Sequence, residues 1–493
     1  MLRPRLYQLV SFHFFLLHLL LSFDPATLVT ATPQQQHHNP APHDITTAQR
    51  ACAELQTQLG ASRIQTPSSP NPEYRNVAAG AWNRFNALSE PACVALPLSS
   101  ADVQVVMKSI FKYSVRYAVQ AGGHSAGAGW GSVDGGIVIS FMNMRSVSYD
   151  PVRDVVTLQP GIRWGEALQE LEPFGVAVLG GRLGNIGTGL LLGGGLSYLS
   201  NAHGFSVDAL EEADVVLVSG EMVTATATNR YSDLFKALKG GANRFGIYDN
   251  STSEALLKAT ADFINNVSDP KASLLSGFST SFTNTTLTPI NFITFFYAGT
   301  SPPPSIFAAF LALPNLGSSV GLHSYMEATA SLGTGREGGG QGQLFGASAF
   351  ASVEGKPATG TGTGAGQGIE DPTKDGVEFA ILAFTAVMKS QVAVGRARGG
   401  NAIDAPLTNY ALVQFHNQMP PGWDAVPRRV SEARRELLRK MVPTPGIPLY
   451  VNECDREQNV FSTYGGYEFL KRTYRKYDPT RFNVRYTDGP EGL

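Results

Sequence analysis

Two glycine clusters constrain the fold of this chain more than any other feature of its sequence. The first is Gly122-Gly123-His124-Ser125 and the second is Gly193-Gly194-Gly195. Glycines at this density let the backbone approach a bulky anionic ligand and turn its N–H groups toward it. A histidine inside such a loop lies where a ring of the ligand could touch it. The sequence therefore predicts a bound dinucleotide with His124 beside its reactive ring.

Size and charge narrow the classes of protein to consider. The chain has 493 residues, which is enough for two domains and a sizeable core. Its formal net charge of −2 gives no electrostatic basis for binding nucleic acid or an anionic membrane. Apart from His37-His38, no two histidines or cysteines have the spacing of metal ligands, so we predict no metal site.

The N-terminus has the pattern of a signal peptide, which we assign to residues 1–31. Arg3 and Arg5 precede an apolar run at 16–21 that is too short to span a membrane, and the small residues at 29–31 offer a cleavage site. We therefore expect a secreted protein without a membrane anchor. Glycosylation sequons, which agree with this route, begin at Asn250, Asn266 and Asn284.

The chain has three cysteines. Cys52 and Cys93 flank the start of the first domain, and in a secreted protein they could form a disulfide. Cys454 would then lie outside any disulfide.

The chain from about Cys52 to Ile247 reads as alternating strands and short helices. A helix is expected from Ala101 after a capping serine, and a strand at 117–120 leads into the first glycine cluster. The run at 215–218 is expected to be a buried strand that ends in a tight turn. Later alternating runs at 291–297 and 410–415 predict strands of a second sheet. The Gly/Thr repeat at 360–365 fits a loose nucleotide motif, but no apolar strand precedes it, so we interpret it as a surface loop.

Several motifs taken together resemble the berberine-bridge-enzyme-like FAD-linked oxidases of fungi, within the vanillyl-alcohol-oxidase superfamily. The resemblance covers about residues 50–247 and 448–483. The motifs are Trp82-Asn83, Pro97, the two glycine clusters, Asp208, Asp233-Leu234-Phe235, Phe245-Gly246-Ile247, Tyr450-Val451-Asn452, and Lys476-Tyr477-Asp478-Pro479 with Phe482.

The resemblance implies an α+β fold with a PCMH-type FAD-binding domain of two subdomains. It also implies a substrate domain whose antiparallel sheet is backed by helices. The expected boundaries are 32–86 for an N-terminal segment that packs on the flavin domain, 87–247 for the FAD-binding domain, 248–447 for the substrate domain and 448–493 for a C-terminal segment that returns to the flavin domain.

The resemblance also assigns roles at the cofactor. His124 matches the histidine that these enzymes join covalently to the flavin 8α-methyl group. Leu183 stands where relatives with a second link carry a cysteine, so a single covalent bond is expected. The other expected FAD-binding residues are Gly122, Gly123, Ser125, Gly187, Thr188, Gly193, Gly194, Gly246, Ile247 and Asn452.

The resemblance does not assign the catalytic base, because Glu453 stands where many relatives have a tyrosine. Tyr450 and Glu453 are the candidates, since a buried carboxylate with a raised pKa can accept a proton. Glu453 could equally be a solvated surface acid. Gln414 and His416 would share one face of a strand and are candidates for substrate contact.

We therefore expect a monomeric oxidase that takes a hydride from a C–H next to oxygen or nitrogen in a secondary metabolite and passes electrons to O2, giving H2O2. An oligosaccharide substrate is the alternative within the enzyme class. A flavin-binding protein without turnover is the alternative outside it.

The sequence also predicts a gap at the end of the flavin domain. In relatives Phe-Gly-Ile enters a long strand, whereas here Phe245-Gly246-Ile247 is followed at once by the polar turn 248–251 and a helical pattern. A strand of ordinary length needs five or six residues. We therefore predict that this chain lacks a strand and the linker between its domains.

Overall fold

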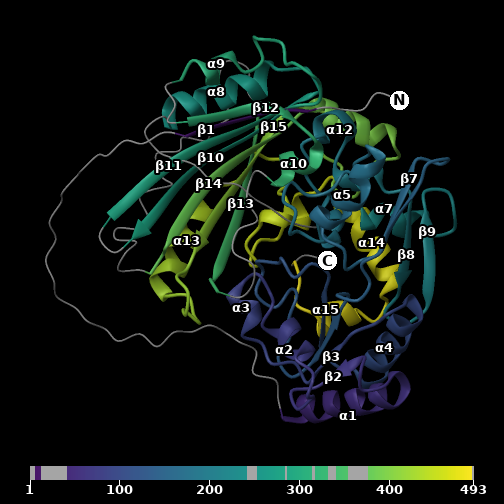
Figure 1. Ribbon diagram of the computed structural model, residues 1–493. Coiled ribbons are helices and arrows are strands. Elements are labelled where there is room, and N and C mark those ends of the chain that lie inside the picture. The colour runs from purple at the N-terminus through teal and green to yellow at the C-terminus, as the bar shows by residue number, and fades with distance from the viewer. Residues whose placement is uncertain are drawn as a thin grey trace, which may run out of the picture.

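The computed structural model describes residues 6–12, 42–240, 253–283, 286–313, 317–330, 340–352 and 376–490. One large antiparallel sheet lies beside a group of smaller sheets and helices, and the C-terminal segment lies on that second group (Figure 1). The expected α+β architecture is confirmed.

The first subdomain is a four-stranded sheet in the order β2-β3-β5-β4, in which β2 pairs antiparallel and the other pairs are parallel. Helices α1 and α4 cover this sheet through an apolar core that includes Leu55, Ile110 and Ile137. Ser99 caps α4, as predicted, because its side chain accepts a hydrogen bond from the Asp102 N–H. The elements are α1 (Pro42–Leu59), β2 (Ile64–Gln65), α2 (Glu73–Ala78), α3 (Arg84–Ala87), β3 (Cys93–Ala95), α4 (Ser100–Tyr113), β4 (Tyr117–Gln120) and β5 (Ile137–Ser140).

A disulfide joins Cys52 on α1 to Cys93 on β3, which confirms the predicted pair. Cys454 is buried and lies outside any disulfide.

Replacing Cys52 and Cys93 with serine is expected to lower the free energy of unfolding. The bond closes a loop with a sequence separation of 41 residues, which corresponds to about 3–4 kcal/mol in the loop-closure model. Denaturant unfolding of the double variant measures the difference. An unchanged midpoint would show that the bond does not stabilise the fold.

The second subdomain contains two separate hairpins, β6–β7 and β8–β9, with no strand pairing between them among the described residues. The strand expected at 215–218 overlaps β8 at Val215 and Val216, but the prediction that it is buried was wrong, because β8 is a partly exposed strand of the second hairpin. The elements are β6 (Val147–Asp150), β7 (Val155–Leu158), α5 (Trp164–Leu171), η1 (Glu172–Phe174), η2 (Thr188–Gly193), α6 (Ser200–His203), η3 (Ser206–Ala209), β8 (Glu212–Val216), β9 (Met222–Thr226) and α7 (Ser232–Leu238).

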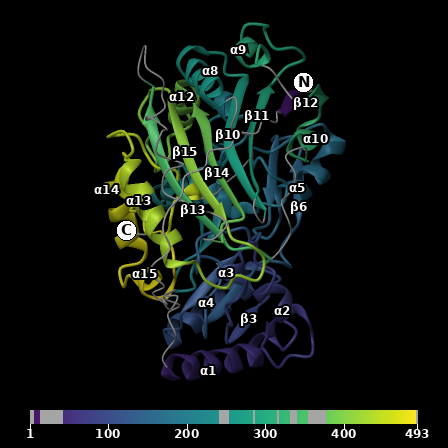
Figure 2. The ribbon, with the colours of Figure 1, turned by 90° about the vertical axis from the view of Figure 1, so that its left-hand side faces the viewer.

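The large sheet has seven strands in the order β12-β1-β11-β10-β14-β15-β13, and all of its pairs are antiparallel. Helices α8, α9 and α13 back one face, while the opposite face is turned toward the two subdomains (Figures 1 and 2). The strands are β1 (Leu6–Phe12), β10 (Ala272–Thr283), β11 (Thr286–Tyr297), β12 (Gly317–His323), β13 (Gln343–Ala351), β14 (Phe379–Val387) and β15 (Tyr410–Gln418). The helices are α8 (Ser253–Asn266), α9 (Ala308–Leu311), α10 (Tyr325–Ala330), α12 (Lys389–Ala397) and α13 (Arg428–Lys440).

Strand β1 comes from within the predicted signal peptide, yet it pairs with both β11 and β12. Residues 253–418 thus supply six of the seven strands. Cleavage after residue 31 would leave β11 and β12 without their common neighbour. The signal peptide itself stays a prediction.

The C-terminal segment crosses from the large sheet back to the subdomains. Lys476 and Tyr477 at the end of α14 contact Asp233 on α7, and Phe482 of α15 enters the core under α4. The elements are η5 (Val451–Glu453), η6 (Phe461–Thr463), α14 (Tyr467–Tyr477) and α15 (Phe482–Tyr486). Across the described ranges, no helix is both long enough and apolar enough to cross a bilayer.

Candidate active site

The first glycine cluster touches the loop that carries the second. A Cβ on Gly122 would come within 2.6 Å of the Gly187 N, and a Cβ on Gly187 would come within 2.4 Å of the Gly122 N. Only glycine permits this backbone contact. Arg163, at the start of α5, donates to the Gly122 carbonyl at 3.3 Å. This bond connects α5 to the point where the backbones at Gly122 and Gly187 cross.

His124 is buried and stacks on Trp82, with ring centroids 4.2 Å apart and an interplanar angle of 12°. The backbone N–H of Trp82 donates to the Gly123 carbonyl at 2.9 Å, so the backbone at Trp82 also holds the loop. The next residue, Ser125, has a buried Oγ with no hydrogen-bond partner in the described part of the chain. The loop therefore presents an imidazole and an available hydroxyl side by side.

The second cluster follows the short helix η2, which begins at Thr188. The Thr188 hydroxyl donates to the Pro160 carbonyl at 2.6 Å. Gly194 and Gly195 have φ values of +95° and +71°, which favour glycine. A Cβ on Gly195 would also lie 2.7 Å from the Ser206 Cβ. Turn geometry and packing therefore account for these two glycines without reference to a ligand.

Leu183 is buried in an apolar cluster with Ala126, Ile186 and Leu190. Leu183 thus lies close to the loop that carries His124. It offers no sulfur for a bond to the cofactor.

The C-terminal motif Tyr450-Val451-Asn452 contacts the segment at 180–195 that carries the second glycine cluster, which we call the second glycine loop. The Asn452 side-chain amide donates to the Leu190 carbonyl at 3.3 Å. Tyr450, Asn452 and Glu453 are all buried, so the alternative that Glu453 is a solvated surface acid is wrong. The Glu453 Oε1 lies 3.6 Å from a guanidinium nitrogen of Arg182.

Tyr450 is poorly suited to accept a proton. Burial raises the pKa of its hydroxyl well above the usual value, and the neighbouring Glu453 carboxylate raises it further, while Arg182 lowers it. The phenol therefore stays protonated at neutral pH and can donate a hydrogen bond. Of the two candidates, Glu453 is the one suited to act as a base.

Gln414 and His416 lie on one face of β15, as predicted. The Gln414 Nε2 is buried and has no hydrogen-bond partner among the described residues. His416 lies 2.6 Å from the Gln343 Oε1 and 6.3 Å from the Trp82 ring, so it shares an aromatic group with His124. In register with Gln414 are three small residues on adjacent strands: Ala347, Ala383 and Gly277. Because these three residues are small, no bulky side chain stands beside Gln414 at these positions of the sheet.

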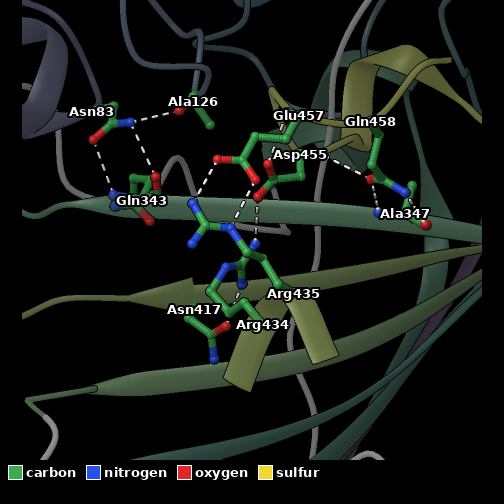
Figure 3. A network of polar contacts seen from close by, with 10 residues as sticks. All are labelled: Asn83, Ala126, Gln343, Ala347, Asn417, Arg434, Arg435, Asp455, Glu457 and Gln458. Atoms are coloured by element: carbon green, nitrogen blue, oxygen red, sulfur yellow. Dashed lines mark hydrogen bonds and ion pairs between the residues drawn. The ribbon is translucent and has the colours of Figure 1, made fainter. Parts of the chain in front are cut away.

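Side-chain amides hold edge strand β13 between the subdomains and the C-terminal segment (Figure 3). Asn83 accepts from the Gln343 N–H at 3.0 Å and donates to the carbonyls of Gln343 and Ala126. Gln458 accepts from the Ala347 N–H at 2.9 Å and donates to its carbonyl at 2.8 Å. Each amide thus pairs with the backbone as a neighbouring strand would.

Two arginines on α13 reach the same C-terminal segment (Figure 3). Buried Arg434 joins Asn417 on β15 to Asp455, two residues after Glu453. Arg435 makes an exposed ion pair with Glu457 at 2.8 Å. These contacts fix the turn that carries Tyr450 and Glu453 against the sheet.

The residues present fit a flavin dinucleotide. A backbone crossing that only glycine permits, an available Ser125 hydroxyl and a buried imidazole lie together in one loop. Gly246 and Ile247 lie outside the described residues, as do Asn250 and Asn284, whereas Asn266 is exposed at the end of α8. In the described ranges, no cluster of three or more histidine, cysteine or acidic side chains could hold a metal ion.

Residues 91–226 match the family described as "FAD binding domain". An FAD-dependent monooxygenase of Arthrobotrys oligospora is 29% identical over 430 residues, which cover 79% of this chain and 80% of that protein. An uncharacterized FAD-linked oxidoreductase of Arthroderma benhamiae is 32% identical over 299 residues, which cover 56% of this chain and 58% of that protein.

The fold is also that of several solved oxidases. The xylooligosaccharide oxidase of Myceliophthora thermophila superposes with a TM-score of 0.70 at 21% identity, over 90% of this chain and all of that one. The carbohydrate oxidase of Microdochium nivale superposes with a TM-score of 0.68 at 20% identity, with the same coverage. These likenesses establish the fold, which is of the PCMH type.

Together these findings confirm the resemblance to berberine-bridge-like FAD-linked oxidases. The chain therefore carries an FAD-binding domain at residues 91–226 and is similar to FAD-linked oxidoreductases along most of its length.

Sequence reasoning overlooked two residues that help to form the site. Trp82 stood in a motif that was recognised and Arg182 directly precedes Leu183, but neither was given a role. The signal available for Arg182 was its place directly before Leu183, in a loop otherwise made of small and apolar residues. Its partner lies 271 positions further along the chain, so spacing alone could not reveal the pair.

Proposed function

We propose that this chain is a secreted FAD-linked oxidase in which Glu453 is the base. The observation that carries the proposal is a buried carboxylate, next to a buried phenol that stays protonated, on the turn that touches the second glycine loop. A buried carboxylate can accept a proton when its surroundings hold it in place.

Each residue then has a definite task. FAD, when bound, would accept the hydride and pass two electrons to O2, giving H2O2. Glu453 accepts the proton from the substrate O–H as the C–H bond breaks, so an alcohol becomes a carbonyl compound. Tyr450 donates a hydrogen bond to the substrate oxygen, and the Gln414 Nε2 offers a second donor from the sheet.

The aromatic surroundings favour an aromatic or polycyclic alcohol over a sugar. Trp82 and Phe345 flank His416, with Phe345 at 4.6 Å and edge-on. Flat apolar rings pack well against such side chains. An oligosaccharide stays the alternative substrate class.

A screen for peroxide release tests the proposal. Purified protein is offered sugars, aliphatic alcohols and aromatic metabolites in air, and the flavin absorbance is followed without oxygen in parallel. We expect peroxide and flavin bleaching with an aromatic alcohol. Turnover of sugars alone would favour the oligosaccharide alternative. A flavin that photoreduces but responds to no substrate would favour a binding protein without turnover.

Replacing His124 with alanine should convert a covalently bound flavin into a dissociable one. In the unsubstituted protein we expect the flavin to stay with the polypeptide after acid precipitation, because the imidazole is joined to the 8α carbon. In His124→Ala the released fraction should approach all of the flavin. The matched control is His416→Ala, which removes the other histidine beside Trp82 and should leave the flavin attached. Equal release from both variants and the parent would contradict the link.

A further inference from the structure

A buried ion pair lies where the second glycine loop, the large sheet and the C-terminal segment meet. Arg182 belongs to the glycine loop, and its side chain is 5% exposed. It donates to the Thr385 hydroxyl on β14 at 3.2 Å and lies 3.6 Å from the Glu453 carboxylate on η5. One guanidinium therefore joins three parts of the chain next to Glu453, the proposed catalytic base.

We propose that Arg182 is a positioning residue that keeps Glu453 ionised and directed toward the substrate, and thereby sets the lower pH limit of catalysis. The inference rests on the proposed function for its catalytic part. Its electrostatic part, that Glu453 depends on Arg182 for its charge, does not.

The energetics of burial support this role. The Glu453 side chain is 3% exposed, and a carboxylate taken out of water stays ionised only if an opposite charge or several donors compensate it. Arg182 carries a full positive charge at any ordinary pH and brings a planar set of donors. The contact with Thr385 fixes that plane, so the guanidinium cannot turn away from Glu453 without losing a hydrogen bond.

Three buried phenols lie near the pair. Burial raises the pKa of Tyr198, Tyr325 and Tyr450, and Arg182 lowers the pKa of each in part. With these hydroxyls protonated at neutral pH, Arg182 supplies a positive charge 3.6 Å from the Glu453 carboxylate that none of the three phenols can supply.

A small cavity adjoins the guanidinium on its other side. Arg182, Tyr198, Thr385 and Gln391 contribute to its lining, and its volume of about 10 Å³ for the centre of a water molecule is room for one water. Both amide atoms of Gln391 and the Tyr198 hydroxyl are buried there without a hydrogen-bond partner among the described residues. The guanidinium thus has polar groups on both sides.

The test compares Arg182→Met, Arg182→Lys and the double variant Arg182→Met/Glu453→Gln. Without the guanidinium, the buried carboxyl should bind its proton at higher pH, because the positive charge that Arg182 places beside it is gone. Infrared difference spectra at pH 7 should then show a protonated carboxyl band in Arg182→Met that the double variant lacks. This readout needs no substrate, so it stands even if the proposed reaction is wrong.

The kinetic readout follows from the same change. Below its pKa a base loses about tenfold in its ionised fraction for each unit that the pKa rises. We expect kcat of Arg182→Met at pH 6 to fall at least about tenfold and to recover as the pH rises, with Arg182→Lys in between. At a pH high enough to ionise the carboxyl, the double variant should be more stable to denaturant than Arg182→Met, since Arg182→Met then buries a carboxylate without its arginine.

The matched control is Arg434→Met, which removes a buried arginine from the other side of the same segment. Arg434→Met should lower stability but leave the pH dependence of kcat where it was. If Arg182→Met does not fold, Arg182→Lys carries the test, through an acidic limit of kcat that should lie at higher pH than in the parent. The proposal would be overturned if the Glu453 carboxyl stays ionised at pH 7 in Arg182→Met. It would also be overturned if kcat falls at the same acidic pH in all variants.

Discussion

Replacing Glu453 with glutamine is expected to lower kcat by about 10²–10⁴-fold, the usual contribution of a positioned base. Glutamine keeps the shape of the buried side chain and its ability to accept from Arg182, but it cannot take a proton. The flavin should remain bound at one per chain. Anaerobic flavin reduction by substrate, followed by stopped flow, isolates the affected step.

Glu457→Gln is the control for this substitution. Glu457 lies four residues along the same segment, but its side chain is 55% exposed and pairs with Arg435 on the surface. Exposed pairs of this kind contribute at most about 1 kcal/mol to stability, so kcat should stay within about twofold of the parent. Rapid flavin reduction in Glu453→Gln would assign the base elsewhere, with Tyr450 next to be tested.

Inserting a strand–loop–strand unit after Ile247 is expected to raise flavin content from a small fraction to about one per chain. The sequence predicts that such a unit is missing, and the two hairpins of the second subdomain share no strand pairing in the part of the chain that the structure describes. The strand position between β11 and β12 in the large sheet is occupied by β1, whose residues belong to the predicted signal peptide. If that segment is cleaved, the backbone groups facing that position lose their partners, which is costly for a buried sheet. About 20–30 residues would supply the two strands and their connection.

The control is an insertion of equal length made of glycine and serine. Such a segment relieves a short connection without supplying strands, so it should not recover flavin content. Secreted yield and the ratio of flavin to protein absorbance are the measurements. Full flavin content and turnover in the chain as written would show that the gap is harmless.

The local elements were the most predictable part of the fold. The capping serine before Ala101 and the β-branched run at Ile137–Ser140 determine their own structure, because their signals lie within a few residues. The strand expected at 215–218 was placed two to three residues too late and was expected to be buried, whereas β8 (Glu212–Val216) belongs to a partly exposed hairpin. A short apolar run does not reveal whether a second layer covers it.

The residues expected to bind the cofactor were predictable from the sequence. The surroundings of the proposed catalytic base were much less predictable. His124 and the glycines were identified from motifs that lie close together in the sequence. The burial of Glu453 depends on how residues 451–453 fold against Arg182 and Leu190, more than 260 positions earlier. The side-chain amides that pair with β13 were equally hidden, because an amide that takes the place of a strand has no sequence pattern.

The most direct test of the central claim is the mass of the proteolytic peptide that contains His124, measured on protein denatured in acid. We predict that this peptide carries one FAD on the histidine and that no cysteine-containing peptide carries any. An unmodified His124 peptide, with all of the flavin free in the supernatant, would contradict the account of the site.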